Sequence, residues 1–294
     1  MDDSLHQVTD PMVRPKVLLP AALFTLTVIT TVIAGALHSG ADIFSNPYDL
    51  LKGVPFSASL IFILGTHELG HYIASKRHGI LTTLPVFIPG PPIPPLIGTF
   101  GAVIRIKSPI TVKDALVDIG GAGPLSGFLV AIAITAIGLK YSAIMPQKAV
   151  EGSLGLGSSL VFNLLSYIVL GPPPDGYDVV LHPVAFAGWI GFFVTAMNLL
   201  PIGQLDGGHL VYALLGPRHR AVSIFMVAVL VILGIFTWHG WLLWAALITA
   251  IGMRHPPILD EDAQMDKRRK LISISSLAVF ILTFMPTPFY VIGQ

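Results

Sequence analysis

The chain has 294 residues, of which 53% are hydrophobic and only 11% are charged, and its formal net charge is +1. This composition indicates a polytopic membrane protein, and it excludes an ordinary soluble enzyme and a continuous basic face for nucleic acid. Because cysteine is absent, a transition metal could be held only by histidine, carboxylate or water.

Apolar runs of about 20 residues, the length that a helix needs to cross a bilayer, follow one another along the chain. Five of them extend over residues 17–37, 54–75, 119–139, 183–200 and 271–292. A further run, 221–253, would be roughly 50 Å long as one helix, so we expect it to fold back near residues 237–240. The short segment 156–171 is predicted to be an interfacial or partly inserted helix. The predicted fold is an all-α membrane protein with about six to seven transmembrane helices.

The second apolar run contains the sequence His67-Glu68-Leu69-Gly70-His71. On a helix the two imidazoles lie one turn apart on the same face with the glutamate beside them, as in zinc hydrolases. In a soluble helix such a match can be a solvated polar face, but ionisable groups inside a span indicate function. We therefore predict that His67 and His71 bind Zn²⁺ and that Glu68 is a catalytic base.

Residues 82–114, between the second and third runs, are too apolar for an ordinary cytosolic loop. The alternation in GTFGAVIRIKS, residues 98–108, predicts a short strand, and the prolines before it disfavour a helix. One interpretation is a proline-rich linker that lies on the membrane surface. The other is a re-entrant, β-hairpin-like loop whose edge pairs with an extended peptide. In that case Phe100, Ile104 and Ile106 are candidates for contact with the substrate.

Two later segments can approach the histidine helix. The glycines Gly120, Gly121, Gly123 and Gly127 are predicted to let the third span pack closely against it. The histidines lie one to two turns before Lys76 and Arg77, and Asp206, at the end of another span, lies about three turns before Arg218. With seven spans they can meet near the inner third of the bilayer, so Asp206 is the candidate for the third metal ligand. His209 would share nearly the same helix face, where we expect it to support the ligands or lie at an interface, although direct ligation stays an alternative.

Asn198 precedes this aspartate and is followed by Pro201, which frees a backbone carbonyl. The asparagine amide could hydrogen-bond the backbone of a substrate. Alternatively, it could form a hydrogen bond between helices.

The distribution of lysine and arginine predicts the orientation of the chain. With seven spans and the N-terminus inside, all 17 basic residues except Lys52, Lys140 and Lys148 lie on the inner side. The N-terminus and the metal site should therefore face the cytosolic side of an integral, multi-pass membrane protein.

Three pieces of the chain together resemble the site-2 protease family of intramembrane zinc metalloproteases. They are HELGH, the GGAGPLSG of residues 120–127, and the Asn198-Leu199-Leu200-Pro201 that precedes Leu205-Asp206-Gly207. This resemblance implies that His67, His71 and Asp206 are zinc ligands and that Glu68 activates the water. It covers residues 54–215, the expected catalytic core. The apolar runs and the basic residues predict a cytosolic tail (1–16) and a first transmembrane helix with its outer loop (17–53) before this core, and C-terminal transmembrane helices (216–294) after it.

The expected function is zinc-dependent cleavage of a single-pass membrane protein within or near its transmembrane segment, known as regulated intramembrane proteolysis. The expected partners are that substrate and the lipid bilayer, while the oligomeric state is unknown. The alternative function is a metal-binding membrane protein without hydrolytic activity, either a transporter or a scaffold. A transporter should carry ligands along a route through the bilayer, whereas the ionisable groups here lie at one depth and include a base.

Overall fold

The computed structural model describes residues 17–93, 96–149, 152–260 and 263–293, so the predicted cytosolic tail lies outside the described residues. The helices are α1 (Leu18–His38), α2 (Val54–Arg77), α3 (Lys113–Leu139), α4 (Leu160–Leu170), α5 (Pro183–Asn198), α6 (Asp206–Leu215), α7 (His219–Phe236), α8 (Gly240–Ile251) and α9 (Lys267–Thr283), with the 3₁₀ helices η1 (Pro47–Gly53), η2 (Gln147–Ala149) and η3 (Gly216–Arg218). The strands of this part of the chain form antiparallel pairs: β1 (Val86–Pro89) with β2 (Thr99–Val103), β3 (Ala143–Pro146) with β5 (Tyr177–Val180), and β4 (Leu154–Leu156) with β6 (Phe289–Val291).

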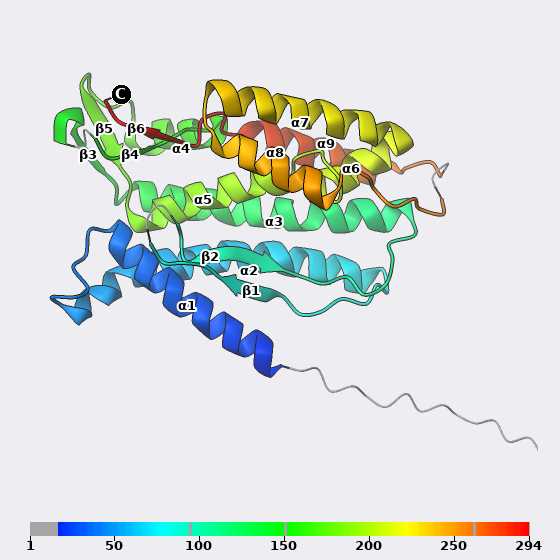
Figure 1. Ribbon diagram of the computed structural model, residues 1–294, viewed down its shortest axis with the longest axis horizontal. Coiled ribbons are helices and arrows are strands. Elements are labelled where there is room, and N and C mark those ends of the chain that lie inside the picture. Colours follow the sequence, from blue (N-terminus) through cyan, green and yellow to red (C-terminus); the bar gives the residue numbers. More distant parts are fainter. Residues whose placement is uncertain (1–16, 94–95, 150–151, 261–262, 294) are drawn as a thin grey trace, which may run out of the picture.

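The helices form a layered bundle with α3 at its centre (Figure 1). α3 contacts α2 and α5 along its length, and it also contacts α4, α6 and α9. The α7–α8 pair covers one side of this core, and α1 crosses the other side. The largest fully buried side chains include Trp189, Phe192 and Leu60, which belong to the main apolar cluster between α2, α3 and α5.

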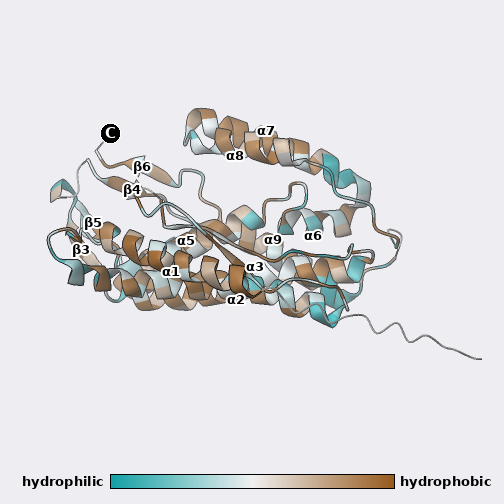
Figure 2. Cartoon of the chain, turned by 60° about the horizontal axis from the view of Figure 1, so that its bottom comes forward, coloured by the Kyte–Doolittle hydropathy of each residue, from teal (hydrophilic) through white to brown (hydrophobic). Residues whose placement is uncertain are grey.

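Within the described ranges, four helical segments are long and apolar enough to cross a membrane: Leu18–His38, Pro47–Arg77, Lys113–Leu139 and Asp206–Phe236. The apolar helices α4, α5 and α8 are shorter. Apolar residues colour most of the bundle in Figure 2, and hydrophilic residues gather toward its two ends. The predicted helical membrane fold is therefore confirmed, whereas the count of six to seven spans stays a prediction.

Local sequence signals explain several of the helix limits. Proline has no amide to leave unpaired, so Pro183 suits the first turn of α5, where the His182 ring accepts a hydrogen bond from the Val184 amide. Asp266 caps α9 by accepting a hydrogen bond from the Arg269 amide at 2.8 Å. The expected fold-back near residues 237–240 is confirmed, because α7 ends at Phe236 and α8 begins at Gly240.

The sequence-based limits of the last helix and the all-α assignment need correction. The apolar run 271–292 predicted one helix, but α9 ends at Thr283 because Pro286 and Pro288 cannot donate the amides that a longer helix requires. The chain then enters β6, which pairs with β4. The pairs β3–β5 and β4–β6 were not predicted, since each strand has only three or four residues.

Ion pairs tie α2, α3 and α9 together at one end of the bundle, which we call the ionic end. The Asp118 carboxylate on α3 lies 2.9 Å from Nε2 of His78, just after α2, and 2.8 Å from Nη2 of Arg269 on α9. Nη1 of Arg269 lies 3.0 Å from the Asp114 carboxylate. The pairs β3–β5 and β4–β6 lie at the opposite end, which we call the strand end (Figure 1).

The β1–β2 hairpin lies between α1 and α2 and extends along them (Figure 1). Near the ionic end, the Lys107 amide donates to the Leu81 carbonyl at 2.7 Å. Near the other end of the hairpin, the Thr30 hydroxyl of α1 donates to the Gly98 carbonyl at 2.6 Å, and Nε2 of His38 lies 3.2 Å from the Leu96 carbonyl. The predicted strand and hairpin are thus present, and they pack against α1 and α2.

Candidate metal centre

Two histidines of α2 and an aspartate of α6, far from them in the sequence, converge near the ionic end of the bundle. Nε2 of His71 lies 3.0 Å from Nε2 of His67 and 3.2 Å from Oδ2 of Asp206, and the His67–Asp206 distance is 3.4 Å. His67 and His71 are 4% and 6% exposed. The Asp206 side chain is less buried, with 17% exposed, and the three atoms form a compact triangle.

This triangle fits the donor set and the size of one face of a tetrahedral zinc site. With bonds of about 2.0–2.1 Å, neighbouring ligand atoms in such a site lie roughly 3.3 Å apart. Nδ1 of His71 lies 2.8 Å from the Ile119 carbonyl. A carbonyl can only accept, so Nδ1 carries the proton and Nε2 keeps its lone pair for a metal.

Asp206 reaches the histidines because it opens α6 directly after a tightly packed loop. Carboxylates are favoured at helix N-termini, where unpaired amides and the helix dipole carry positive partial charge. The next two residues are glycines because the loop leaves no room for a side chain. A Cβ on Gly207 would lie 1.9 Å from the Leu199 carbonyl oxygen, and one on Gly208 would lie 2.4 Å from the Gly203 carbonyl oxygen.

The glycines of α3 make room for the predicted ligands, although not all in the predicted way. A Cβ on Gly123 would lie 2.1 Å from Nε2 of His71, and one on Gly127 would lie 3.1 Å from Cβ of His67. These two glycines allow the predicted close approach to the histidine helix. Gly120 faces His209 of α6 and Gly121 faces α9 instead, because successive helix positions point in different directions.

Glu68 lies next to the triangle and is 8% exposed. Its carboxylate is hydrogen-bonded by the backbone of Ile104, just after β2. The amides of Arg105 and Lys107 donate to Thr83 and Leu81 on the other arm of the hairpin. Because amides alternate along an extended strand, those of Ile104 and Ile106 face the opposite edge. That edge is therefore the one beside Glu68.

The other predicted substrate-contacting residues occupy different surroundings. Nδ2 of Asn198 lies 3.2 Å from Nε2 of His67, which places this amide inside the metal centre. Phe100 is 67% exposed on β2, four residues nearer the hairpin tip than Ile104. The Ile106 side chain packs against the cluster that contains Ala74 and Ile119. The structure thus brings Asn198 and Ile104 to the metal centre, but not the Phe100 and Ile106 side chains.

His209 lies next to the centre but outside the triangle formed by the three predicted ligands. Its Nδ1 lies 2.7 Å from Nε2 of His255, a residue in the segment between α8 and α9. His255 was not identified from the sequence. In the sequence it is a histidine before two prolines at the end of an apolar run. This pattern does not have the spacing of a known metal-binding motif.

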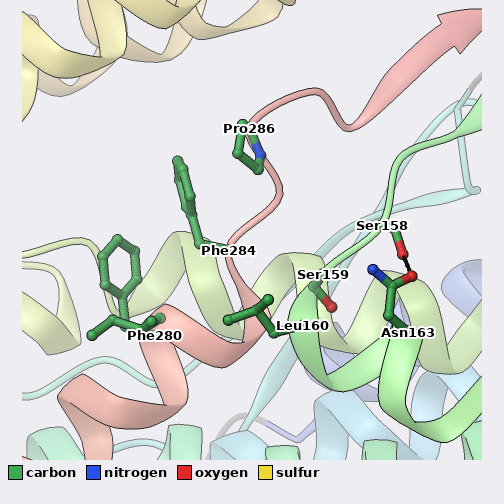
Figure 3. Close-up of a pocket in the computed structure, with 8 residues that line it drawn as sticks. Ser158, Ser159, Leu160, Asn163, Phe280, Phe284 and Pro286 are labelled. Atoms are coloured by element: carbon green, nitrogen blue, oxygen red, sulfur yellow. Dashed lines mark hydrogen bonds between the residues drawn. The ribbon is translucent and has the colours of Figure 1, made fainter.

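Two cavities lie toward the strand end, away from the triangle. The first, about 330 Å³, is lined by Ser158, Ser159, Leu160, Asn163, Phe280, Ile281, Phe284 and Pro286. In Figure 3 the Ser158 hydroxyl and the Asn163 amide face each other on one side, and Phe280 and Phe284 lie on the other. A second cavity, of about 520 Å³, also includes Ser158 and Asn163 in its lining. Neither lining includes a residue of the metal centre.

Comparisons with known proteins agree with this geometry. The family model described as Peptidase family M50 matches residues 55–238. "Probable zinc metalloprotease EGY1, chloroplastic" of Arabidopsis thaliana is 32% identical over 79% of this chain and 43% of its own length. "Probable zinc metalloprotease EGY2, chloroplastic" of the same plant is 29% identical over 93% of this chain and 48% of its own length. The chain thus spans less than half the length of these two relatives, and no solved structure matches it.

Proposed function

This chain belongs to peptidase family M50, and we propose that it is a zinc-dependent endopeptidase that cleaves a single-pass membrane protein within or near its transmembrane segment. The observation that carries the proposal is the compact triangle of His67, His71 and Asp206 beside the Glu68 carboxylate. The three side chains would hold the zinc ion, leaving its fourth position for water or substrate. When bound, zinc supplies Lewis acidity, which polarises a peptide carbonyl and lowers the pKa of a water to about 7.

Glu68 is the general base of the proposed reaction. Its carboxylate accepts the proton of the attacking water and then donates it to the leaving amine as the peptide bond breaks. The hydrogen bond from the Ile104 backbone orients this carboxylate. A neutral amide donor can hold the carboxylate in place without neutralising it.

Asn198 holds the substrate in this proposal. Its amide nitrogen lies 3.2 Å from Nε2 of His67, whose lone pair is the one that a metal would take. With that lone pair engaged, the amide is free to donate to a substrate carbonyl. Its position inside the centre favours this role over a simple hydrogen bond between helices.

The hairpin supplies an edge on which an unwound substrate can pair. Only an extended peptide exposes a scissile carbonyl, and strand addition stabilises the extended form through backbone hydrogen bonds. The amides of Ile104 and Ile106 point to the edge next to Glu68, which supports this role. The exposed Phe100 ring then offers an apolar contact farther along the same strand.

The substrate is expected to be cut near the cytosolic side. The ionic end carries Lys76 and Arg77 at the end of α2, and Lys267 and Arg268 open α9 beside the Asp118–Arg269 pair. Basic residues favour the inner side of a membrane. Reporter fusions after Lys113 and after Ile144 should therefore fall on opposite sides, with the Lys113 fusion inside, and two fusions on one side would exclude this topology.

The activity can be tested with Glu68→Gln, which keeps the shape of the side chain but removes the base. The full chain is co-expressed with a library of tagged single-pass proteins, and fragments made by the wild type are compared with those of Glu68→Gln and of the exposed control Asp175→Asn. We expect a loss of cleavage of about 10²- to 10⁴-fold in Glu68→Gln, with about one zinc per purified chain retained. Unchanged cleavage by Glu68→Gln would exclude the proposed mechanism.

A further inference from the structure

The segment between α8 and α9 crosses from the helix that carries Asp206 to the start of α3. At one end, Nε2 of His255 lies 2.7 Å from Nδ1 of His209, on the first turn of α6. At the other end, the Leu259 amide donates to the Thr111 carbonyl at 2.8 Å, and the Asp260 carboxylate accepts from the Lys113 amide at 2.7 Å. Residues 255–260 therefore bridge two elements that both contact the metal centre.

The same segment also touches the loop before Asp206. A Cβ on Gly203 would lie 2.5 Å from the Gly252 carbonyl oxygen, so the two backbones are in close contact. Ser223 of α7 supports this loop from another side, since its hydroxyl accepts from the Gly203 amide at 3.3 Å. The backbone before α6 is thus held by contacts that come from later parts of the chain.

His255 is held in a defined orientation. Its ring stacks on Tyr212 with a centroid distance of 4.2 Å and an angle of 19°, and its Nδ1 lies 2.6 Å from the Pro256 carbonyl. Nδ1 must therefore carry the proton, which leaves Nε2 as the acceptor for His209. Burial lowers the pKa of His255, which favours the uncharged ring that can accept this bond.

We propose that His255 is a positioning residue for the metal centre: its hydrogen bond to His209 holds the first turn of α6, and with it Asp206, in place against α2 and α3. His209 lies one helical turn after Asp206, so a displacement of its ring moves the aspartate as well. Gly120 reinforces the coupling, because a Cβ there would lie 3.1 Å from Cβ of His209 and 3.3 Å from the Asp206 carbonyl oxygen. The inference rests on the proposed zinc site.

Two substitutions at position 255 separate the hydrogen bond from the ring stack. His255→Phe keeps a ring on Tyr212 but cannot accept from His209, whereas His255→Gln loses the ring and keeps both a donor and an acceptor. Zinc affinity of the purified, metal-free full chain is measured in detergent by competition with a chelator. We expect a loss of about 10-fold for His255→Phe, in the range seen when the hydrogen-bond support of metal ligands is removed, and substantial recovery for His255→Gln.

The matched control is His239→Phe, which changes an exposed histidine in the turn between α7 and α8 and should leave zinc affinity unchanged. Wild-type affinity in His255→Phe, or a greater loss in His255→Gln than in His255→Phe, would overturn the inference. If the wild type itself binds no zinc, the proposed function fails as well. If His255→Phe does not fold, His209→Phe breaks the same bond from the other side, and failure of both to fold would assign the pair to folding alone.

Discussion

Gly123 at the metal centre and Gly171 at the strand end require glycine for opposite reasons. At the metal centre, a Cβ on Gly123 would lie 2.1 Å from Nε2 of His71, so glycine is needed for lack of space. At the strand end, a Cβ on Gly171 or Gly176 would meet no described atom within 4 Å, but the φ angles of these residues are 74° and 78°. Glycine is needed there for its backbone freedom. Close contact thus requires glycine at position 123, and local chain conformation requires it at positions 171 and 176.

The largest difference in zinc binding should appear between variants that remove ionisable residues at the metal centre and variants that remove them elsewhere. Alanine at His67, His71 or Asp206 should each lower zinc affinity by more than about 100-fold, since even residues that only support ligands contribute 10- to 100-fold. Asp175→Ala and His239→Ala, both exposed residues outside the metal centre, should retain about one zinc per chain. Metal analysis of the purified proteins gives the comparison. Full zinc content in Asp206→Ala would make His209 the next candidate for the third ligand.

Replacing glycine by alanine should distinguish the position that lacks space, Gly123, from the position that needs a positive φ, Gly171. Gly123→Ala should reduce both zinc binding and cleavage, by about 100-fold, because the methyl group displaces a ligand. Gly171→Ala should keep zinc and lose about 1–3 kcal/mol of stability, because its φ of 74° with a ψ of −179° lies in a region that is almost restricted to glycine. Gly65→Ala is the control within α2, since its Cβ would meet only Phe87 at 3.5 Å. Equal zinc binding by the Gly123 and Gly65 variants would refute the steric argument.

Substitutions at the hairpin edge should have a smaller effect on cleavage and should leave zinc binding unchanged. Ile104→Pro removes the amide that hydrogen-bonds Glu68, whereas Ile104→Ala keeps the amide and shortens the side chain. We expect Ile104→Pro to slow cleavage by about 10-fold more than Ile104→Ala, as for the loss of one hydrogen bond to a charged group. Zinc content should be the same in both. If the two variants cleave at equal rates, the edge amide has no part in catalysis.

The smallest effect on cleavage is expected at the strand end. Trp189 is 1% exposed, and its Nε1 donates to the Gly157 carbonyl at 2.6 Å, which holds the chain just after β4. Trp189→Phe should lower stability by about 1–3 kcal/mol through the lost bond and poorer packing. Thermal unfolding in detergent measures this loss. Zinc affinity should not change, and a parallel loss of zinc would mean that the two ends are coupled.

Much of the metal centre could be predicted because its chemistry is local. His67, Glu68 and His71 lie within two turns of one helix, so their spacing alone determines which face they share. The limits of α2 and α5 also agree with the apolar runs, since both helices begin at the predicted residue. Asp206 could be paired with the histidines only through topology and the family resemblance.

The features that could not be predicted depend on contacts between distant segments. β6 pairs with β4 across more than 130 residues of sequence, and neither strand has an alternating pattern long enough to recognise. His255 matters only because its segment returns to α6. The separate directions of Gly120 and Gly121 likewise required the positions of α6 and α9, which the sequence does not provide.

Residues that meet at and near the metal centre are far apart in the sequence, and this has a consequence for the synthesis of the chain on the ribosome. The Asn198–His67 contact joins residues 131 positions apart, and the Lys113–Asp260 contact joins residues 147 positions apart. A chain emerging from the ribosome at about 5–20 residues per second would thus hold both histidines many seconds before the aspartate is made. We expect nascent chains stalled before residue 206 to bind zinc weakly and to cut nothing. Under the proposed function, peptidase activity would then become possible only after Asp206 has been made.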